Sequence, residues 1–193
     1  MKKGILILLA VIVVLVLWYM TSYNSLVSAE EGVSKQWANV ESQYQRRADL
    51  IPNLVATVKG YASHESETLE GVVAARARAT QVTVDAESLT SDKLQEYQAA
   101  QGELSAALGR LLMITENYPE LKANQNFLEL QAQLEGTENR IQVERSRYNE
   151  ITGSFNTAIR RFPKNIIASI SGFERKPYFE AEAESRKAPN VAF

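Results

Sequence analysis

The chain has 193 residues, with 21 basic and 23 acidic side chains and a net charge of −2, so it lacks the basic surface that nucleic-acid binding requires. It contains no cysteine, which excludes disulfides, thiolate nucleophiles and cysteine-ligated zinc. Its length is enough for one domain with a substantial hydrophobic core.

The first element is an uncharged apolar run over residues 5–20, preceded by Lys2 and Lys3. A helix over residues 4–23 would be ~30 Å long, about the thickness of a bilayer's hydrocarbon core. Aromatic side chains of the kind found at bilayer surfaces stand at its far end, namely Trp18, Tyr19 and Tyr23. We therefore predict a transmembrane anchor, with the two lysines and the three aromatic residues at its membrane interfaces.

A cleaved secretory signal peptide is the alternative interpretation, because Lys2 and Lys3 also suit its basic start. The nearest small-x-small cleavage pattern, at residues 27–29, lies well beyond the apolar run, so we expect the anchor to be retained. Glu30 and Glu31 follow the run, whereas lysines precede it. The positive-inside rule then places the N-terminus in the cytoplasm and the rest of the chain outside.

A helical heptad pattern continues after the anchor, at Leu26, Val33, Trp37, Val40 and Tyr44. Only Gly32 disfavours a helix between residues 19 and 47, so the anchor can continue into this stretch as one long rod.

We expect a second helix to begin near Asp49, with Pro52 in its first turn, and to lose its apolar stripe at a loop over residues 81–91. Its stripe consists of Ile51, Leu54, Val58, Tyr61, Val72, Ala75 and Ala79. Arg46, Arg47 and Asp49 are interpreted as a helix–helix corner, in which Asp49 caps the next helix and the arginines pair with carboxylates. A patch that faces a partner is the alternative.

The third helix is predicted from about residue 92 to residue 117, capped by Thr90 or Ser91 and stopped at Tyr118-Pro119. The fourth carries large apolar residues at strict heptad spacing: Phe127, Leu134, Ile141, Tyr148, Phe155 and Phe162. This pattern predicts the core of a bundle or coiled coil, without a cofactor, that ends at Pro163.

The last segment, residues 164–193, has its own apolar residues, among them Ile166, Ile170, Phe173 and the Tyr178-Phe179 pair. Apolar side chains this late in a chain should dock on something. The chain's own bundle is one candidate, and a partner protein, a neighbouring subunit or the membrane surface is the other.

Catalytic patterns are missing from the sequence. The single histidine, His64, is followed by Glu65, but Thr68 occupies the position of the second histidine of a zinc-protease helix. We interpret His64 as an exposed helix residue. No nucleophile motif or glycine-rich phosphate loop occurs, so we expect no enzymatic activity, no metal site and no cofactor.

Several short blocks resemble the LemA family: residues 23–27 (YNSLV), 46–55 (RRADLIPNLV), 58–62 (VKGYA), 116–119 (ENYP), 134–141 (LEGTENRI), 148–149 (YN), 155–157 (FNT) and 178–180 (YFE). The resemblance extends over essentially the whole chain. It implies a bacterial single-pass membrane protein with an antiparallel helical bundle, and it brings no catalytic motif.

The sequence therefore predicts an all-α protein. Its parts are a transmembrane helix (residues 1–23), an antiparallel bundle of about four long helices (24–163) and a C-terminal tail (164–193). We expect a non-enzymatic scaffold that binds membrane or envelope proteins, or copies of itself, at the outer face of the cytoplasmic membrane. The alternative is an envelope sensor with a small molecule bound in the bundle. The candidate partner contacts are Phe173, Tyr178, Phe179, Arg46, Arg47 and Asp49.

Overall fold

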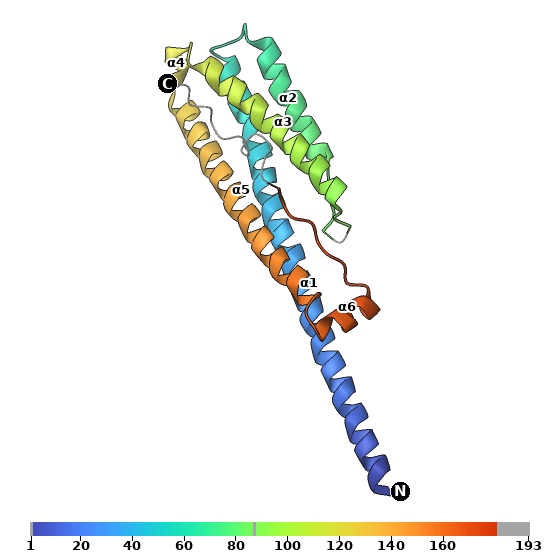
Figure 1. The fold of residues 1–193 in the computed structure, drawn as a ribbon. Helices are drawn as coiled ribbons and strands as arrows, with labels where there is room; N and C mark the ends of the chain where they lie inside the picture. The colour runs from blue at the N-terminus through green and yellow to red at the C-terminus, as the bar shows by residue number, and fades with distance from the viewer. Residues whose placement is uncertain (1, 87, 181–193) are drawn as a thin grey trace, which may run out of the picture.

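The fold is an antiparallel bundle of four long helices, one of which extends far beyond the others (Figure 1). The computed structural model describes residues 2–86 and 88–180, which contain six helices and no strand. These helices are α1 (Lys2–Lys59), α2 (Ser66–Gln81), α3 (Ser91–Thr115), α4 (Pro119–Lys122), α5 (Gln125–Ala158) and α6 (Lys164–Ser171). The predicted all-α bundle is confirmed.

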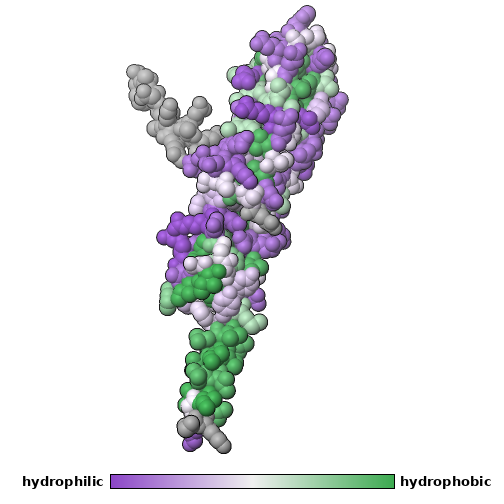
Figure 2. Space-filling view, turned by 90° about the vertical axis from the view of Figure 1, so that its right-hand side faces the viewer, coloured by the Kyte–Doolittle hydropathy of each residue, from purple (hydrophilic) through white to green (hydrophobic). Residues whose placement is uncertain are grey.

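Helix α1 is a single rod of 58 residues, which corresponds to ~87 Å of helix. Its apolar beginning is long enough to cross a membrane, and residues 3–17 are all exposed. Figure 2 shows this end as a narrow hydrophobic stem below a largely hydrophilic bundle. The predicted continuation of the apolar run into the bundle is therefore confirmed.

The predicted corner at Arg46–Asp49 is wrong, because α1 continues through Pro52 to Lys59. Proline has no N–H to donate to the carbonyl four residues earlier, which here belongs to Ala48. The Nε of Arg76, on α2, donates to that carbonyl oxygen instead, at 2.7 Å. A residue from the neighbouring helix thus supplies the hydrogen bond that proline cannot make.

The chain reverses between α1 and α2, where the sequence had indicated one uninterrupted helix. The N–H groups of Tyr61 and Ala62 both donate to the carbonyl of Val58, which closes the end of α1. His64 is exposed, as predicted, but it lies in this turn and not on a helix. Tyr61, which the sequence predicts on the apolar stripe of the second helix, is also exposed in this turn. At the next reversal, Thr90 caps α3 as predicted, through a hydrogen bond from the N–H of Lys93.

Two hydrophobic cores are stacked along the bundle. The core nearer the apolar stem, the lower core, joins α1 to α5 and to parts of α3 and α6, and includes Leu26, Val33, Trp37, Tyr44, Tyr97, Ile141, Tyr148, Phe155 and Ile167. The upper core joins all four long helices and includes Ile51, Leu54, Val72, Leu104, Leu111, Phe127 and Leu134. The heptad prediction for α5 holds from Phe127 to Phe155 and fails at Phe162, whose side chain is 80% exposed. Helix α5 ends at Ala158, earlier than the predicted end at Pro163. Phe162 therefore lies outside the helix, where heptad spacing no longer places a side chain in the core.

The hydrogen bond from Arg76 predicts a pairwise energetic coupling with Pro52. Substituting Arg76→Ala should lower the free energy of unfolding by about 1–2 kcal/mol, because the buried Ala48 carbonyl loses its partner. In a Pro52→Ala background the same change should cost less, since the substituted alanine can donate from its own N–H. Urea unfolding of all four proteins in mild detergent measures this coupling, and strictly additive effects would contradict it.

Candidate functional site

A buried arginine lies between the two cores and connects all four long helices. Arg47 on α1 is 1% exposed. Its guanidinium donates to Glu138 Oε1 on α5 at 2.6 Å, to Ser105 Oγ on α3 at 2.8 Å and to Gln101 Oε1 on α3 at 2.6 Å. The side-chain amide of Gln101 in turn donates to the carbonyl of Ala79 at the end of α2. We call Arg47, Gln101, Ser105 and Glu138 the polar layer.

The polar layer contains one ion pair, between Arg47 and Glu138, and it reaches solvent at Glu138. Glu138 is 39% exposed, so its carboxylate keeps part of its hydration while it pairs with Arg47. The Arg47 guanidinium also lies 5.1 Å from the ring centre of Tyr44, which adds a cation–π contact. A shift of α1 along α3 or α5 would separate this buried cation from its partners, which would cost stability.

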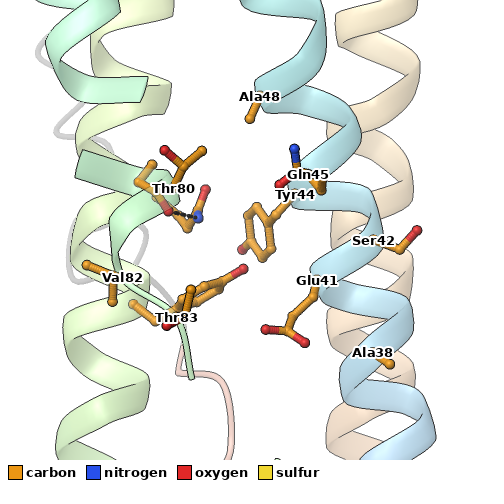
Figure 3. A pocket seen from close by; sticks show the side chains of 12 residues that line it. Ala38, Glu41, Ser42, Tyr44, Gln45, Ala48, Thr80, Val82 and Thr83 are labelled. Atoms are coloured by element: carbon orange, nitrogen blue, oxygen red, sulfur yellow. Dashed lines mark hydrogen bonds between the residues drawn. The ribbon is translucent and has the colours of Figure 1, made fainter. Parts of the chain in front are cut away.

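A cavity of about 340 Å³ opens beside the polar layer, between α1 and the hairpin formed by α2 and α3. Figure 3 shows Glu41, Tyr44 and Gln45 projecting into it from α1, with Thr80 and Thr83 opposite. Tyr97 and Gln101 complete the wall from α3. The lining therefore combines aromatic faces, hydroxyl groups and one carboxylate, which suits a small polar or cationic molecule better than an apolar one.

The titratable groups of this cavity are perturbed by burial. Desolvation raises the pKa of Glu41 above its ordinary value of 4.5; the nearby indole N–H of Trp37 partly offsets this, and the charge of Asp85 adds to it. Burial likewise raises the pKa of Tyr97. Burial thus disfavours the charged form of the Glu41 carboxyl.

Residues 172–180 dock on the chain's own bundle, and the rest of the predicted tail, residues 181–193, lies outside the described residues. Gly172, with a φ of 75°, ends α6 in the left-handed conformation, and the following residues run extended along α5. The side-chain amide of Asn156 exchanges two hydrogen bonds with the backbone of Lys176, and Asn149 does the same with Phe179. Seven helical residues rise ~10.5 Å and three extended residues span ~10 Å, so two asparagines one heptad apart on α5 match the spacing of Lys176 and Phe179 in the extended segment.

Phe179 is the residue of the docked segment that is buried in the lower core. Its ring stacks on Trp37 at 5.7 Å between centroids and meets Tyr148 edge-on at 5.3 Å. The Arg145 guanidinium lies 4.9 Å from the centre of the same ring. Burial raises the pKa of Tyr148 to about 12, and its hydroxyl donates to the carbonyl of Pro177. Phe179 therefore completes the lower core.

The predicted contact residues are distributed over different environments. Arg47 and Phe179 are buried, and Phe173 is half-buried against Tyr23. Arg46, Asp49 and Tyr178 are exposed. Among the predicted membrane-interface residues, Tyr19 stacks on Tyr23 and Trp18 packs against the lower core, while Lys2 and Lys3 stand at the start of α1.

Sequence reasoning missed Asn149, Asn156 and the glutamine of the polar layer. A usable signal was present for the asparagines: each directly follows an aromatic core residue, Tyr148 or Phe155, so the aromatic–asparagine pair repeats at seven residues. Gln101 had no such signal, because nothing local distinguishes a buried glutamine from an exposed one. Within residues 2–86 and 88–180, no three His, Asp or Glu side chains converge in a way that could hold a metal ion.

The fold and these contacts define a helical-bundle protein on a long apolar stem. Residues 36–193 match the model of the LemA family, so the chain belongs to that family.

Three relatives show how far the similarity extends. Magnetosome protein MamQ 2 of Paramagnetospirillum magneticum is 30% identical over 177 residues, which cover 82% of this chain and 64% of the relative. Magnetosome protein MamQ of Magnetospirillum gryphiswaldense is 29% identical, over 81% of this chain and 64% of the relative. Protein LemA of Metamycoplasma hominis is 24% identical, over 87% of this chain and 73% of the relative. The chain thus spans just under two thirds of the magnetosome relatives' length.

Breaking the polar layer should destabilise the bundle. Arg47→Ala leaves Gln101 and Glu138 without their shared donor, and we expect a loss of about 3 kcal/mol. The exposed neighbour Arg46→Ala is the matched control, with an expected change within about 0.5 kcal/mol. Urea unfolding in detergent distinguishes them, and equal effects would show that the layer contributes nothing specific.

The adjacent residues of the docked segment give a second matched pair. Phe179→Ala should cost about 3 kcal/mol, because it removes the central ring of the lower core's aromatic cluster. Tyr178→Ala should change stability by about 0.5 kcal/mol or less, since that side chain is 45% exposed. Thermal unfolding followed by circular dichroism tests this, and an unaffected Phe179→Ala protein would refute docking.

The raised pKa of Glu41 predicts a pH-dependent effect on stability. A carboxyl whose pKa is higher in the folded than in the unfolded state costs stability once the pH exceeds its ordinary value of 4.5. Glu41→Gln should therefore raise the unfolding temperature at pH 7, and this gain should vanish below pH 4. Glu96→Gln, at an exposed position on α3, is the control, and a gain that persists at low pH would contradict the assignment.

Proposed function

We propose that this protein is a membrane-tethered helical scaffold, which holds partner proteins or copies of itself at the outer face of the cytoplasmic membrane. In this proposal the N-terminus of α1 lies in the cytoplasm and the bundle lies outside. Tethering confines the bundle to a thin layer above the bilayer, which raises its effective concentration for other membrane-bound proteins.

The observation that carries the proposal is the continuity of α1. The apolar segment and the bundle's central helix are one uninterrupted rod of 58 residues, without a flexible linker between them. A linker would let the domain tumble, whereas a rigid rod keeps its surfaces at set heights above the membrane. That geometry suits a protein whose task is to position other molecules.

The exposed members of the predicted contact set are our candidates for the partner surface. Arg46 and Asp49 lie on the exposed side of α1, and Tyr178 lies on the docked C-terminal segment. A photo-crosslinking amino acid at each position should yield one discrete adduct in living cells, identified by mass spectrometry as an envelope protein or a second copy. The same residue at Val73, exposed on α2, is the control. Identical background at all four positions would contradict the scaffold proposal.

The proposed orientation can be tested directly, because the chain has no native cysteine. A cysteine introduced at Met113, exposed on α3, should react with a membrane-impermeant maleimide in intact spheroplasts. A cysteine introduced at Lys3 should react only after lysis. The reverse labelling pattern would place the bundle in the cytoplasm and exclude the proposed site of action.

A ligand sensor is the second candidate, and the cavity beside Tyr44 favours it. Glu41 and the faces of Tyr44 and Tyr97 form a wall suited to a small organic cation. Small cations such as choline or spermidine should then raise the unfolding temperature of the wild type and leave Glu41→Gln unchanged. An equal response, or none, would exclude a cation site there.

A further inference from the structure

Helix α6 lies beside α1 at the point where the apolar run ends. The hydroxyl groups of Tyr19 and Ser171 are 3.3 Å apart, and Lys164 Nζ donates to Ser25 Oγ at 2.8 Å. Just beyond α6, Phe173 packs against Tyr23 with ring centres 5.8 Å apart. Both ends of the short helix are therefore attached to α1 over residues 19–25.

The length of α1 sets the depth of this attachment. From residue 4 to residue 19 the helix rises ~22 Å, and to residue 23 it rises ~28 Å. A hydrocarbon core is ~30 Å thick, so a helix that enters the bilayer near residue 4 reaches the opposite boundary over residues 19–23. Helix α6 is attached at that level, and in Figure 1 it crosses the rod just above the stem.

Helix α6 has an apolar side that the described residues do not cover. Ile167 and Ala168 are buried against the lower core. In contrast, Phe162, Ile166 and Ile170 are 80%, 48% and 73% exposed. Within α6, the spacing of four residues places Ile166 and Ile170 on one side of the helix, and Phe162 lies in the turn that precedes it. Figure 2 shows hydrophobic surface on this end of the bundle, close to the apolar stem.

Basic side chains accompany this apolar side. Arg160 and Arg161 are exposed in the turn before α6, and Lys164 opens the helix. Arg161, Lys164 and Phe162 also line a surface groove together with hydroxyl groups and the Glu150 carboxylate of α5. Apolar residues beside cations are the combination that binds the headgroup region of a bilayer, where acyl chains and phosphates meet.

We infer that α6 and its preceding turn form a membrane-surface docking element, in which Phe162, Ile166 and Ile170 enter the headgroup region and Arg160 and Arg161 contact lipid phosphates. The inference rests on the proposed role of α1 as a membrane anchor. The occupant of the apolar side is the bilayer that α1 crosses, because α6 is attached at its boundary. Two attachments, one spanning and one on the surface, would set the tilt and rotation of the bundle.

Single-cysteine labelling of the full chain tests this inference. Cysteines introduced at Phe162, Ile166 and Ile170 are labelled with an environment-sensitive fluorophore, and each protein is reconstituted into phosphatidylcholine–phosphatidylglycerol vesicles with or without nitroxide-bearing lipids. We expect several-fold stronger quenching at these three positions than at two exposed apolar control positions, Val143 on α5 and Met113 on α3.

A label at Leu15, within the apolar run, separates failure of the inference from failure of the anchor. Quenching at Leu15 without quenching at Phe162, Ile166 and Ile170 would overturn the docking element and leave the anchor intact. Absence of quenching at all four positions would overturn both. A third outcome is that the labels on α6 are shielded from water but are not quenched by nitroxide lipids. If these labels become exposed to water when the protein is diluted tenfold with lipid, a second copy of the chain covers this side, and the bilayer is not its occupant.

The arginines are tested in the same vesicles. Adding phosphatidylglycerol to phosphatidylcholine should increase quenching at Ile166 in the parent protein and not in an Arg160→Gln/Arg161→Gln double variant. Equal quenching in both proteins at every lipid composition would overturn the assignment of these arginines to lipid phosphates.

Discussion

The Arg47 guanidinium is the interaction on which the bundle's arrangement depends. This cation on α1 donates hydrogen bonds to side chains of both α3 and α5, and Gln101 extends the network to the end of α2. An unpaired cation at this depth would cost far more than a misplaced apolar side chain, so a shift of any one helix along its neighbours is penalised. The two hydrophobic cores on either side supply most of the burial, and the polar layer adds contacts that a shift of one helix would break.

The continuity of α1 gives this register a consequence outside the bundle. Because Arg76 supplies the hydrogen bond that Pro52 cannot make, the helix passes through a residue that normally ends or bends one. The orientation of the apolar stem is thereby linked to the orientation of the polar layer and the cavity beside it. A surface on the bundle is then held in a defined direction relative to whatever the stem enters, which is the property that a membrane scaffold or a membrane-proximal sensor needs.

The lower core is completed by the docked segment that follows α6, because the four long helices do not cover it fully. Helices α2 and α3 are shorter than α1 and α5, so the lower core lacks helical cover on one side, and Phe179 fills part of that space. Asn149 and Asn156 hold the backbone of this segment much as a neighbouring strand would, with paired N–H and carbonyl contacts. The segment's aromatic residues, which looked from the sequence like free contact groups, are divided between an internal role at Phe179 and an exposed one at Tyr178.

By itself the sequence determined the helical class, the apolar stem and most of the core, because heptad spacing and an uncharged run are local signals of burial and of membrane length. It did not determine where helices end: the rod passes through Pro52, and Phe162 lies outside the core although its spacing matches. Only the tertiary structure decided those points, because the partner that rescues Pro52 lies on α2 and the partners of Arg47 lie on two other helices. A hydrogen bond between residues far apart in the chain leaves no periodic trace in the sequence, whereas an apolar face does.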